Sequence, residues 1–530
     1  MSEPTPFSQE ERHALAPYFT NVDGPVFALR NLPEVVKGAL FARYSRSAKS
    51  LRRLFLDEFY DHVGALPVAS GVGIDRAERL YERVFDDYGD DSVAQLGGAH
   101  LACEGASNIL TKVLEWGRLM SYLEQSTRYV AYDDRHGERW KYLVPAELND
   151  PPLRAEYTAC LDAAFATYAR WLAPIEAYCR RKFPKEPGDP EAVYARTIRA
   201  KALDTLRGLL PAATQSNVGL FGSGQAYEAL LLRMRVHPLA EVRIYANLML
   251  TELRAVIPSF LKRVDRPDRG GRWSEYLRAT QAATRAMAHR LCVETPAEDQ
   301  ADVVLTDFDP EGEVKVVAAA LYAASTLSDH ELLGVARQLA PHERHAVLQA
   351  YVGDRQNRRH KPGRAFERTG YRFDILTDYG AFRDLQRHRM VSLEWQRLSP
   401  RHGYAVSDLI HEAGAFDDWR RVMERSAETH DLLCSAGLHD VAPYAVSMAY
   451  RVRFYLEVNA REAMHIIELR TAPQGHPAYR RVCQQMHRLI AEQAGHRAIA
   501  AAMAFADHSA VDLARLHAER ATERRRHAPS

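Results

Sequence analysis

The sequence lacks the features that mark several common classes of protein. Its six cysteines are scattered and include no CxxC pair, which excludes a zinc knuckle and a disulfide framework as first expectations. The N-terminal residues are polar and charged, so no signal peptide can be read there. The most apolar run, Val314 to Leu327, is too short and interrupted to span a bilayer. We therefore expect a reduced, cytoplasmic protein with no membrane partner.

The sequence also lacks an excess of charge of either sign. Lys and Arg number 70 against 69 Asp and Glu, which argues against a general polyanion binder, and we expect no nucleic-acid partner. The basic C-terminal stretch, with Arg515, Arg520 and Arg524 to Arg526, is typical of a frayed helix end or solvated tail.

Familiar catalytic signatures are missing as well. The sequence contains no P-loop, GxGxxG, HExxH or GxSxG motif. His342 and His345 lie one helical turn apart, but no carboxylate or cysteine follows at a recognisable ligand spacing, so we expect no metal. No cysteine has the setting of an activated nucleophile.

Helical periodicity dominates what is present. It predicts helical segments in a chain whose 530 residues allow two large domains. The segments are Pro33 to Leu54, Arg76 to Asp86, Leu153 to Lys182, Ala195 to Leu210 and Ala226 to Arg263. Residues Tyr371 to Leu376 alternate as a strand does, and Tyr379 to Gln386 then follow as a helix. Between the turn-rich stretches 263–272 and 294–302 we place the domain boundary, giving domains 1–275 and 295–530.

Three short sequence motifs of the first half recur in the same order in the second half, which indicates a tandem duplication; we call each pair of similar motifs an echo. Arg118-Leu-Met-Ser121 parallels Arg389-Met-Val-Ser392, and Arg233-Met-Arg235 with His237-Pro parallels Leu469-Arg470 with His476-Pro. A weaker echo links the regions that begin at Glu34 and Glu313. We predict a helix-rich α+β fold of two tandem domains, each a small β-sheet with packed helices.

The residues able to carry chemistry are mainly arginines. Arg387-His388-Arg389 offers forked donors that suit phosphate, pyrophosphate or the anionic N1–C2=O edge of a flavin, although a solvated helix face is the simpler alternative. On the segment 459–470, Arg461 and His465 share one helix face and Arg470 projects from nearly the opposite one. Ser121 to Tyr129 and Arg207 combine hydroxyls, a carboxylate and arginines that suit a phosphorylated nucleoside, or else a polar turn with a structural ion pair.

In order, these pieces resemble the flavin-dependent thymidylate synthases, the ThyX family, whose signature is RHR followed by seven residues and Ser, within RHRxxSxNExSxRY. The resemblance covers both halves, but they depart from the pattern in opposite ways. Trp116-Gly117-Arg118 replaces RHR in the first half, and Ser223-Gly-Gln225 falls where N-A-R is expected. In the second half Trp395, Arg397 and Ser399 replace the nucleotide-binding Glu, Ser and Arg, and Pro443 lies near the expected RxxLP arginine.

The resemblance implies a role for each matching residue. Flavin-binding residues are expected in the second half: His360, Glu367, Arg387, His388, Arg389, Asn459, Arg461 and His465. Substrate-binding residues are expected in the first: Arg118, Glu124, Ser126, Arg128 and Arg207. Arg470 is expected to be catalytic, polarising the uracil ring. Because family protomers form tetramers whose sites draw on several chains, the resemblance implies that two fused protomers share a composite site and that the chain is a homodimer.

The implied activity is the FAD-dependent reductive methylation of dUMP to dTMP, with methylenetetrahydrofolate as the one-carbon donor and NADPH as the reductant. Two alternatives remain open. One is a flavin-dependent modification of another pyrimidine nucleotide or base, and the other is a non-catalytic nucleotide-binding or structural protein on a degenerate scaffold.

Overall fold

The structure is a computed structural model that describes residues 7–32, 36–37, 40–41, 44, 47–60, 98–135, 137, 139–187, 189–296 and 298–509. The predicted helix Arg76 to Asp86 and the basic C-terminal arginines lie outside these residues. Among the residues that the structure describes, no helix is both long and apolar enough to cross a membrane.

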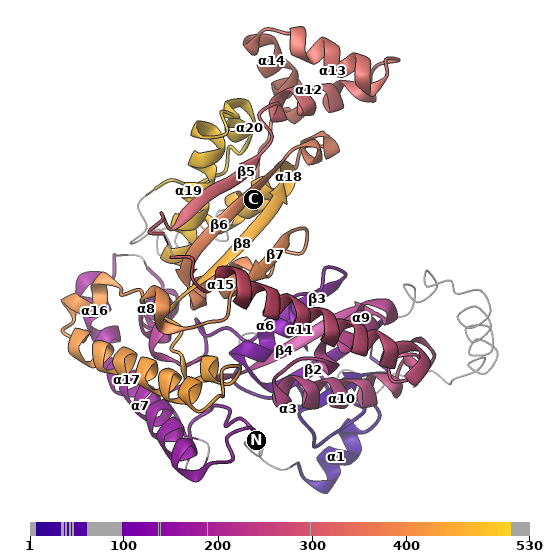
Figure 1. Cartoon of the computed structure of the whole chain (residues 1–530). Helices are drawn as coiled ribbons and strands as arrows, with labels where there is room; N and C mark the ends of the chain where they lie inside the picture. Colours follow the sequence, from indigo (N-terminus) through magenta and orange to yellow (C-terminus); the bar gives the residue numbers. More distant parts are fainter. Residues whose placement is uncertain are drawn as a thin grey trace. The chain divides into compact units, whose positions relative to one another are not determined.

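Two four-stranded antiparallel sheets form the framework (Figure 1). The first has the order β1 (Val26–Leu29), β2 (Gly98–Ser107), β4 (Gln215–Ser223), β3 (Met120–Glu124). The second has the order β5 (Val303–Phe308), β6 (Gly370–Asp378), β8 (Arg451–Asn459), β7 (Ser392–Trp395). The repeated order confirms the predicted α+β fold with two tandem domains, and β6 contains the predicted strand.

Each long strand runs directly into a helix, and a polar side chain at the junction caps that helix. Ser107 caps α6 (Asn108–Leu114) and Asp378 caps α15 (Tyr379–Leu385), at equivalent places in the two sheets. Ser223 caps α9 (Gly224–Arg235) and Asn459 caps α18 (Ala460–Arg470) in the same way. Each cap oxygen accepts a backbone N–H that has no partner inside its helix. Arg235 and Arg470 therefore end equivalent helices, as the third echo predicts.

The remaining described α-helices are, in chain order, α1 (Gln9–Leu15), α3 (Leu51–Glu58), α7 (Pro151–Lys182), α8 (Glu191–Leu206), α10 (Ala240–Arg254), α11 (Arg272–Cys292), α12 (Gly312–Tyr322), α13 (Asp329–Gln338), α14 (Pro341–Val352), α16 (Asp408–Glu412), α17 (Phe416–Ser435), α19 (Pro477–Glu492) and α20 (Arg497–Ala502). Some of them pack on the sheets, such as α10 and α19, and others pack on neighbouring helices, such as α13 and α14. In the second domain α19 packs against β5 and β6, where the buried Tyr371, Phe373 and Ile375 alternate with more exposed residues.

Three predicted helical segments are shorter than the sequence pattern suggested. The segment 226–263 is interrupted at 236–239, since Pro238 lacks an N–H donor and its ring crowds the preceding turn. In the segment 33–54, residues 47–50 are not helical, and Ser50 caps the start of α3. The segment 195–210 leaves α-helical geometry at Arg207, where a short 3₁₀ turn begins.

The chain divides into two compact units, and each unit includes a segment from the other half of the sequence. Unit 1 comprises Met1–Ala173, Leu209–Ala297 and Gly414–Ser447; unit 2 comprises Pro174–Gly208, Glu298–Ala413 and Met448–Ser530. Thus α8, from the first half, belongs to unit 2, and α17, from the second half, belongs to unit 1. The division 1–275 and 295–530 remains a prediction about the tandem repeat itself.

In unit 1 the exchanged segment is fixed by a buried polar contact and by the core. The Tyr444 hydroxyl donates to Glu241 Oε2 at 2.7 Å, and the same carboxylate accepts from the Ser107 N–H and hydroxyl. Tyr444 also joins the hydrophobic core that surrounds Val218 and Leu220 of β4. Residue 444 thus ties the segment 414–447 to the first sheet and to α10.

We expect Tyr444→Phe to lower the free energy of unfolding by about 1–3 kcal/mol, because it removes a buried donor from the Glu241 carboxylate. Urea denaturation followed by circular dichroism measures the change. Tyr322→Phe, at a side chain that is 54% exposed, is the matched control and should change stability by less than about 0.5 kcal/mol. Equal effects of the two substitutions would contradict the anchoring role of Tyr444.

Candidate functional site

A single buried carboxylate in unit 2 gathers three arginines. Arg387 Nη2 donates to Asp384 Oδ1 at 2.5 Å, Arg470 Nη1 lies 3.8 Å from the same oxygen, and Arg207 Nη1 lies 3.7 Å from Oδ2. Asp384 is 8% exposed and is the sixth residue of α15. The structure therefore brings first-half Arg207 together with second-half Arg387 and Arg470, as the predicted composite site requires of this arginine.

Arg207 itself is almost fully buried. It is 4% exposed, and its Nη2 atom makes no hydrogen bond within the described residues. Asp378 Oδ1 lies 3.9 Å from Nη2. A Cβ on Gly380 would lie 2.9 Å from Arg207 Nε, so glycine at this position is what allows the guanidinium to lie against the start of α15. Arg207 is therefore a buried cation whose hydrogen-bonding capacity is incompletely used.

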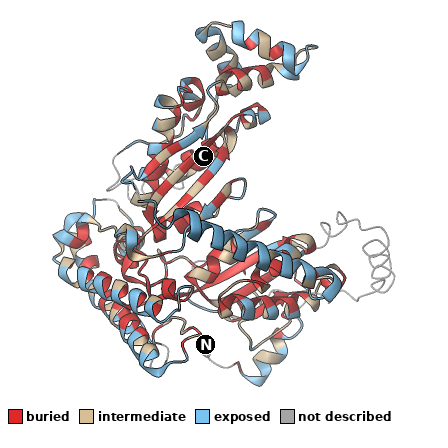
Figure 2. Cartoon of the chain, viewed as in Figure 1, coloured by how far each residue is buried: buried red, intermediate tan, exposed pale blue. Residues whose placement is uncertain are grey.

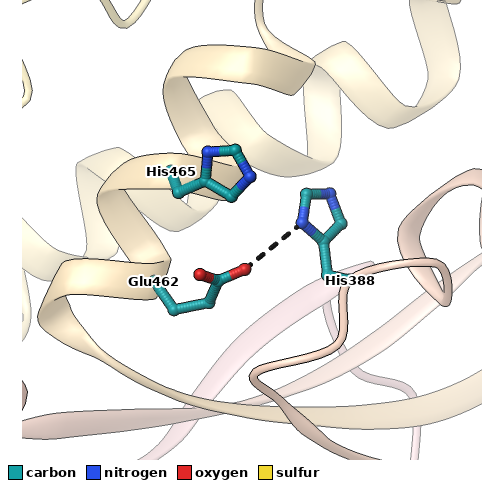
Figure 3. Close-up of side chains that lie close together, drawn as sticks. All are labelled: His388, Glu462 and His465. Atoms are coloured by element: carbon teal, nitrogen blue, oxygen red, sulfur yellow. Dashed lines mark ion pairs between the residues drawn. The ribbon is translucent and has the colours of Figure 1, made fainter. Parts of the chain in front are cut away.

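His388 is the centre of a second group of side chains (Figure 3). Arg470 Nε donates to His388 Nε2 at 3.0 Å, and Glu462 Oε1 lies 3.4 Å from His388 Nδ1. His465, one turn beyond Glu462 on α18, places its ring edge-to-face with that of His388 at a centroid distance of 5.5 Å. Although Arg470 and His465 project from different faces of α18, the long Arg470 side chain reaches the same imidazole that His465 contacts.

The surroundings keep both imidazoles neutral. Burial, followed by the positive charges of Arg470 and Arg387, holds the pKa of His388 well below its usual range. Burial also lowers the pKa of His465 to about 4, whereas burial raises the pKa of the Glu462 carboxyl. An uncharged pair of rings within a ring of guanidinium groups is suited to an anionic ligand rather than to a cation.

Two imidazoles and a carboxylate whose ligand atoms lie within 4.8 Å of one another also form a donor set that divalent metals use. The hydrogen bond from Arg470 favours an anion-binding group over a metal site. A neutral imidazole has one nitrogen lone pair, and His388 uses it at Nε2 to accept from Arg470. Nδ1 then carries the proton and faces Glu462, so in this arrangement His388 offers no lone pair toward a metal.

The other expected flavin-binding residues lie on or beside α18. Arg461 Nε donates to the Pro362 carbonyl at 2.9 Å, and its Nη1 lies 3.3 Å from Glu367 Oε1, which ties the segment 360–367 to the helix. His360 and Arg389 are exposed. Asn459 uses its Oδ1 to cap α18 through the Glu462 N–H. These residues therefore share one region of unit 2 with His388 and His465.

In unit 1 the expected substrate-binding residues have a different setting. Glu124 is 3% exposed, and its carboxylate lies 3.4 Å from the buried Lys112 Nζ, which also pairs with Glu115. Ser126 and Arg128 are half-buried in a turn, where the Arg128 N–H donates to Ser126 Oγ. Arg118 is exposed. The roles assigned to these four residues stay predictions.

Asp384 and Glu462 are the site residues that the sequence analysis did not single out. Both stand three residues before a residue that was named, Arg387 and His465 respectively. Glu462 and His465 share a face of α18, whereas Arg387 lies in the turn after α15. That spacing was available as a signal. It was weak because acidic residues three positions from a basic one are common on solvated helices.

No cysteine contributes to this region as a reactive thiol among the described residues of unit 2. Burial raises the pKa of Cys179 to about 11 and that of Cys483 to about 12, so both are protonated at neutral pH.

Fold and site together define a tandem α+β protein with a cationic cluster built from both halves of its sequence. Residues 41–259 and 303–495 match the family described as "Thymidylate synthase complementing protein". The chain belongs to this family, with two matched segments in tandem.

Individual relatives fall into two groups. The chain is 37% identical over 527 residues to a "UPF0159 protein" of Chlamydia muridarum, covering 98% of this chain and 99% of that protein. It is 29% identical to "UPF0159 protein Ta1429" of Thermoplasma acidophilum, covering 91% and 97%. It is 32% identical over 181 residues to a "Flavin-dependent thymidylate synthase" of Mycobacterium bovis, covering 34% of this chain and 66% of that protein. Among solved structures, a UMP/dUMP methylase from Streptomyces cacaoi bound with 5-Br dUMP aligns with a TM-score of 0.30 at 20% identity, covering 38% and 94%.

We expect Asp384→Asn to destabilise the chain by about 3 kcal/mol, because buried and half-buried guanidinium groups lose their shared counter-charge. Asp417→Asn removes an equally charged group that is 80% exposed and pairs with Arg420 on the surface of α17, and it should cost less than about 1 kcal/mol. Urea denaturation of both variants measures the difference. If Asp384→Asn proves as mild as the control, the arginines do not depend on this carboxylate.

Proposed function

We propose that the chain is an FAD-dependent enzyme that reductively methylates dUMP to dTMP, using methylenetetrahydrofolate and NADPH. The observation that carries this proposal is the meeting of Arg207 with Arg387 and Arg470 around Asp384. The first arginine belongs to the expected substrate set and the second to the expected flavin set. Family membership and the similarity to a flavin-dependent thymidylate synthase support the same chemistry.

The residues present fit a flavin. Lys361, Arg461 and Arg389 add positive charge around Glu462, beside the two neutral imidazoles. This donor set suits the pyrophosphate of FAD and the electron-rich N1–C2=O edge of its ring. Arg387, Arg389 and Arg461 would hold the anionic groups, and His388 and His465 would lie against the ring system. Bound FAD would supply the redox chemistry that no side chain can perform.

The chain's own contribution is then positioning and electrostatics. Arg470 is held from two sides, by His388 at Nε and by Asp384 at Nη1, so its remaining N–H groups have a fixed direction. Fixed donors of this kind stabilise negative charge that develops on a carbonyl oxygen, here that of the uracil ring. Arg207 would take the nucleotide phosphate with the part of its guanidinium that makes no hydrogen bond. Arg118, Glu124, Ser126 and Arg128 complete the proposed substrate set.

Binding assays separate the two residue sets. We expect Arg207→Ala and Arg128→Ala to weaken dUMP binding by the loss of a charge-assisted contact worth about 1.5–3 kcal/mol while flavin binding is retained. Arg387→Ala should weaken FAD binding and spare dUMP. Flavin fluorescence quenching and calorimetric titration with dUMP provide the measurements.

Ser399→Ala is the matched control, since Ser399 stands where the family pattern has its nucleotide-binding arginine, and it should change neither affinity. Melting temperatures confirm that each variant is folded. A dUMP affinity that depends on Ser399 but not on Arg128 would show that the second half has its own nucleotide site. Absence of flavin uptake by the wild-type chain would leave the non-catalytic alternative.

Complementation tests the reaction itself. Expression of the wild-type chain should let a strain that cannot make dTMP grow without thymidine, and Arg470→Ala should abolish that growth, because the carbonyl charge loses its donor. Growth that fails although the purified chain binds FAD would favour a different pyrimidine substrate.

A further inference from the structure

Helix α11 (Arg272–Cys292) is exposed along its whole length. None of its 21 residues is buried, and Figure 2 draws the ribbon almost entirely in the colour of exposed residues. Most of its large apolar side chains are included, since Trp273 is 57% exposed, Met287 45% and Leu291 64%, while Leu277 is half-buried. The helix lies between the two family-matched segments, 41–259 and 303–495, so the shared domain does not account for it.

Large apolar residues and threonines of α11 follow the spacing of a coiled-coil seam. Steps of four and three residues alternate from Trp273 to Leu291, which is the pattern that keeps one stripe facing a partner helix. The seam consists of Trp273, Leu277, Thr280, Thr284, Met287 and Leu291. The Thr280 hydroxyl already donates to the carbonyls of Tyr276 and Leu277, so its methyl group can enter an apolar contact without leaving an unpaired polar atom.

Of the charged residues of α11, Arg290 flanks the seam and donates to Met287 Sδ at 3.3 Å, whereas Arg278 and Arg285 lie away from it. Arg285 Nη1 lies 4.0 Å from Asp440 Oδ2 of the same unit. Arg278 stands on the same side as Arg285, one heptad earlier. The two arginines therefore leave the seam free of the like charges that would otherwise meet across it.

We propose that α11 pairs antiparallel with α11 of a second copy of this chain, through this seam and about a two-fold axis. In that register the large Trp273 meets Leu291 of the second copy, Leu277 meets Met287, and the two threonines meet at the centre. The pattern is complementary to itself because the large Trp273 faces the smaller Leu291 and the similarly sized Leu277 and Met287 face each other.

The positions that flank the seam support the same partner. They are Ser274, Tyr276, Gln281, Ala283, Ala288 and Arg290, so only one of the six is charged. In the antiparallel register Arg290 lies beside Tyr276 of the second copy, a favourable cation–π pairing rather than a like-charge contact. Next to the axis, Gln281 meets Gln281 of the second copy, and Ala283 meets Ala283 of the second copy. A highly charged partner helix of either sign would find few opposite charges along this seam.

Cysteine crosslinking of the full chain tests the pairing. In a Cys292→Ser background, which removes the exposed native thiol, Ala283→Cys should form a disulfide-linked dimer under mild oxidation. Ala279→Cys, on the side of the same helix away from the seam, is the matched control and should not. Adding Met287→Arg and Leu291→Arg to the Ala283→Cys chain should abolish the crosslinked band and loosen the dimer measured by light scattering.

Each other outcome overturns the proposal. Equal crosslinking at 279 and 283 would indicate random collision. If the Ala283→Cys chain neither crosslinks nor reacts with a maleimide, position 283 is inaccessible, which would mean that another part of the same molecule covers the seam. A monomeric wild-type chain, or a crosslink that survives both arginine substitutions, would likewise exclude pairing through α11.

Discussion

The site in unit 2 depends on one carboxylate, Asp384, on which three guanidinium groups converge. Asp384 lies within 2.5–3.8 Å of guanidinium nitrogens from Arg207, Arg387 and Arg470. Asp378 adds a second negative charge on one side only, at 3.9 Å from Arg207. Because three guanidinium groups converge on the Asp384 carboxylate, removing it would leave like charges close together in a buried place.

The two repeats of the chain carry different residues in the region that follows the equivalent strands β2 and β6. In unit 2 the helix that follows the long strand carries Asp384 and leads to His388, whereas the equivalent helix of unit 1, α6, carries the buried Lys112, which pairs with Glu115 and Glu124. Gly117 stands where His388 stands in the other repeat, and its carbonyl accepts from the Tyr122 hydroxyl. The two repeats therefore place different charged groups after equivalent strands.

Much of the fold could be predicted from the sequence because its causes are local. The strand 371–376 and the helix after it follow from alternation and from the capping Asp378. The repeat was visible because equivalent arginines end equivalent helices. The exchange of α8 and α17 between units was not predictable, since both helices have the same local pattern wherever they pack. The break before α10 was missed although Pro238 stood in the segment, because the apolar period on both sides of it continues.

The candidate site shows the same division between local and non-local information. Arg387, His388 and Arg470 could be named as candidates from the sequence because each belongs to a short motif. That Arg470 and His465 would share His388 could not be predicted, because a helical wheel gives the direction of a Cβ atom and not the reach of an arginine. This reach also fixes the chemistry of the site: once Arg470 donates to Nε2, the proton of His388 must lie at Nδ1, toward Glu462. His388, Glu462 and His465 have the composition of a metal site. Because Arg470, at the end of α18, uses the Nε2 lone pair of His388, the group instead presents neutral imidazole rings beside a guanidinium donor.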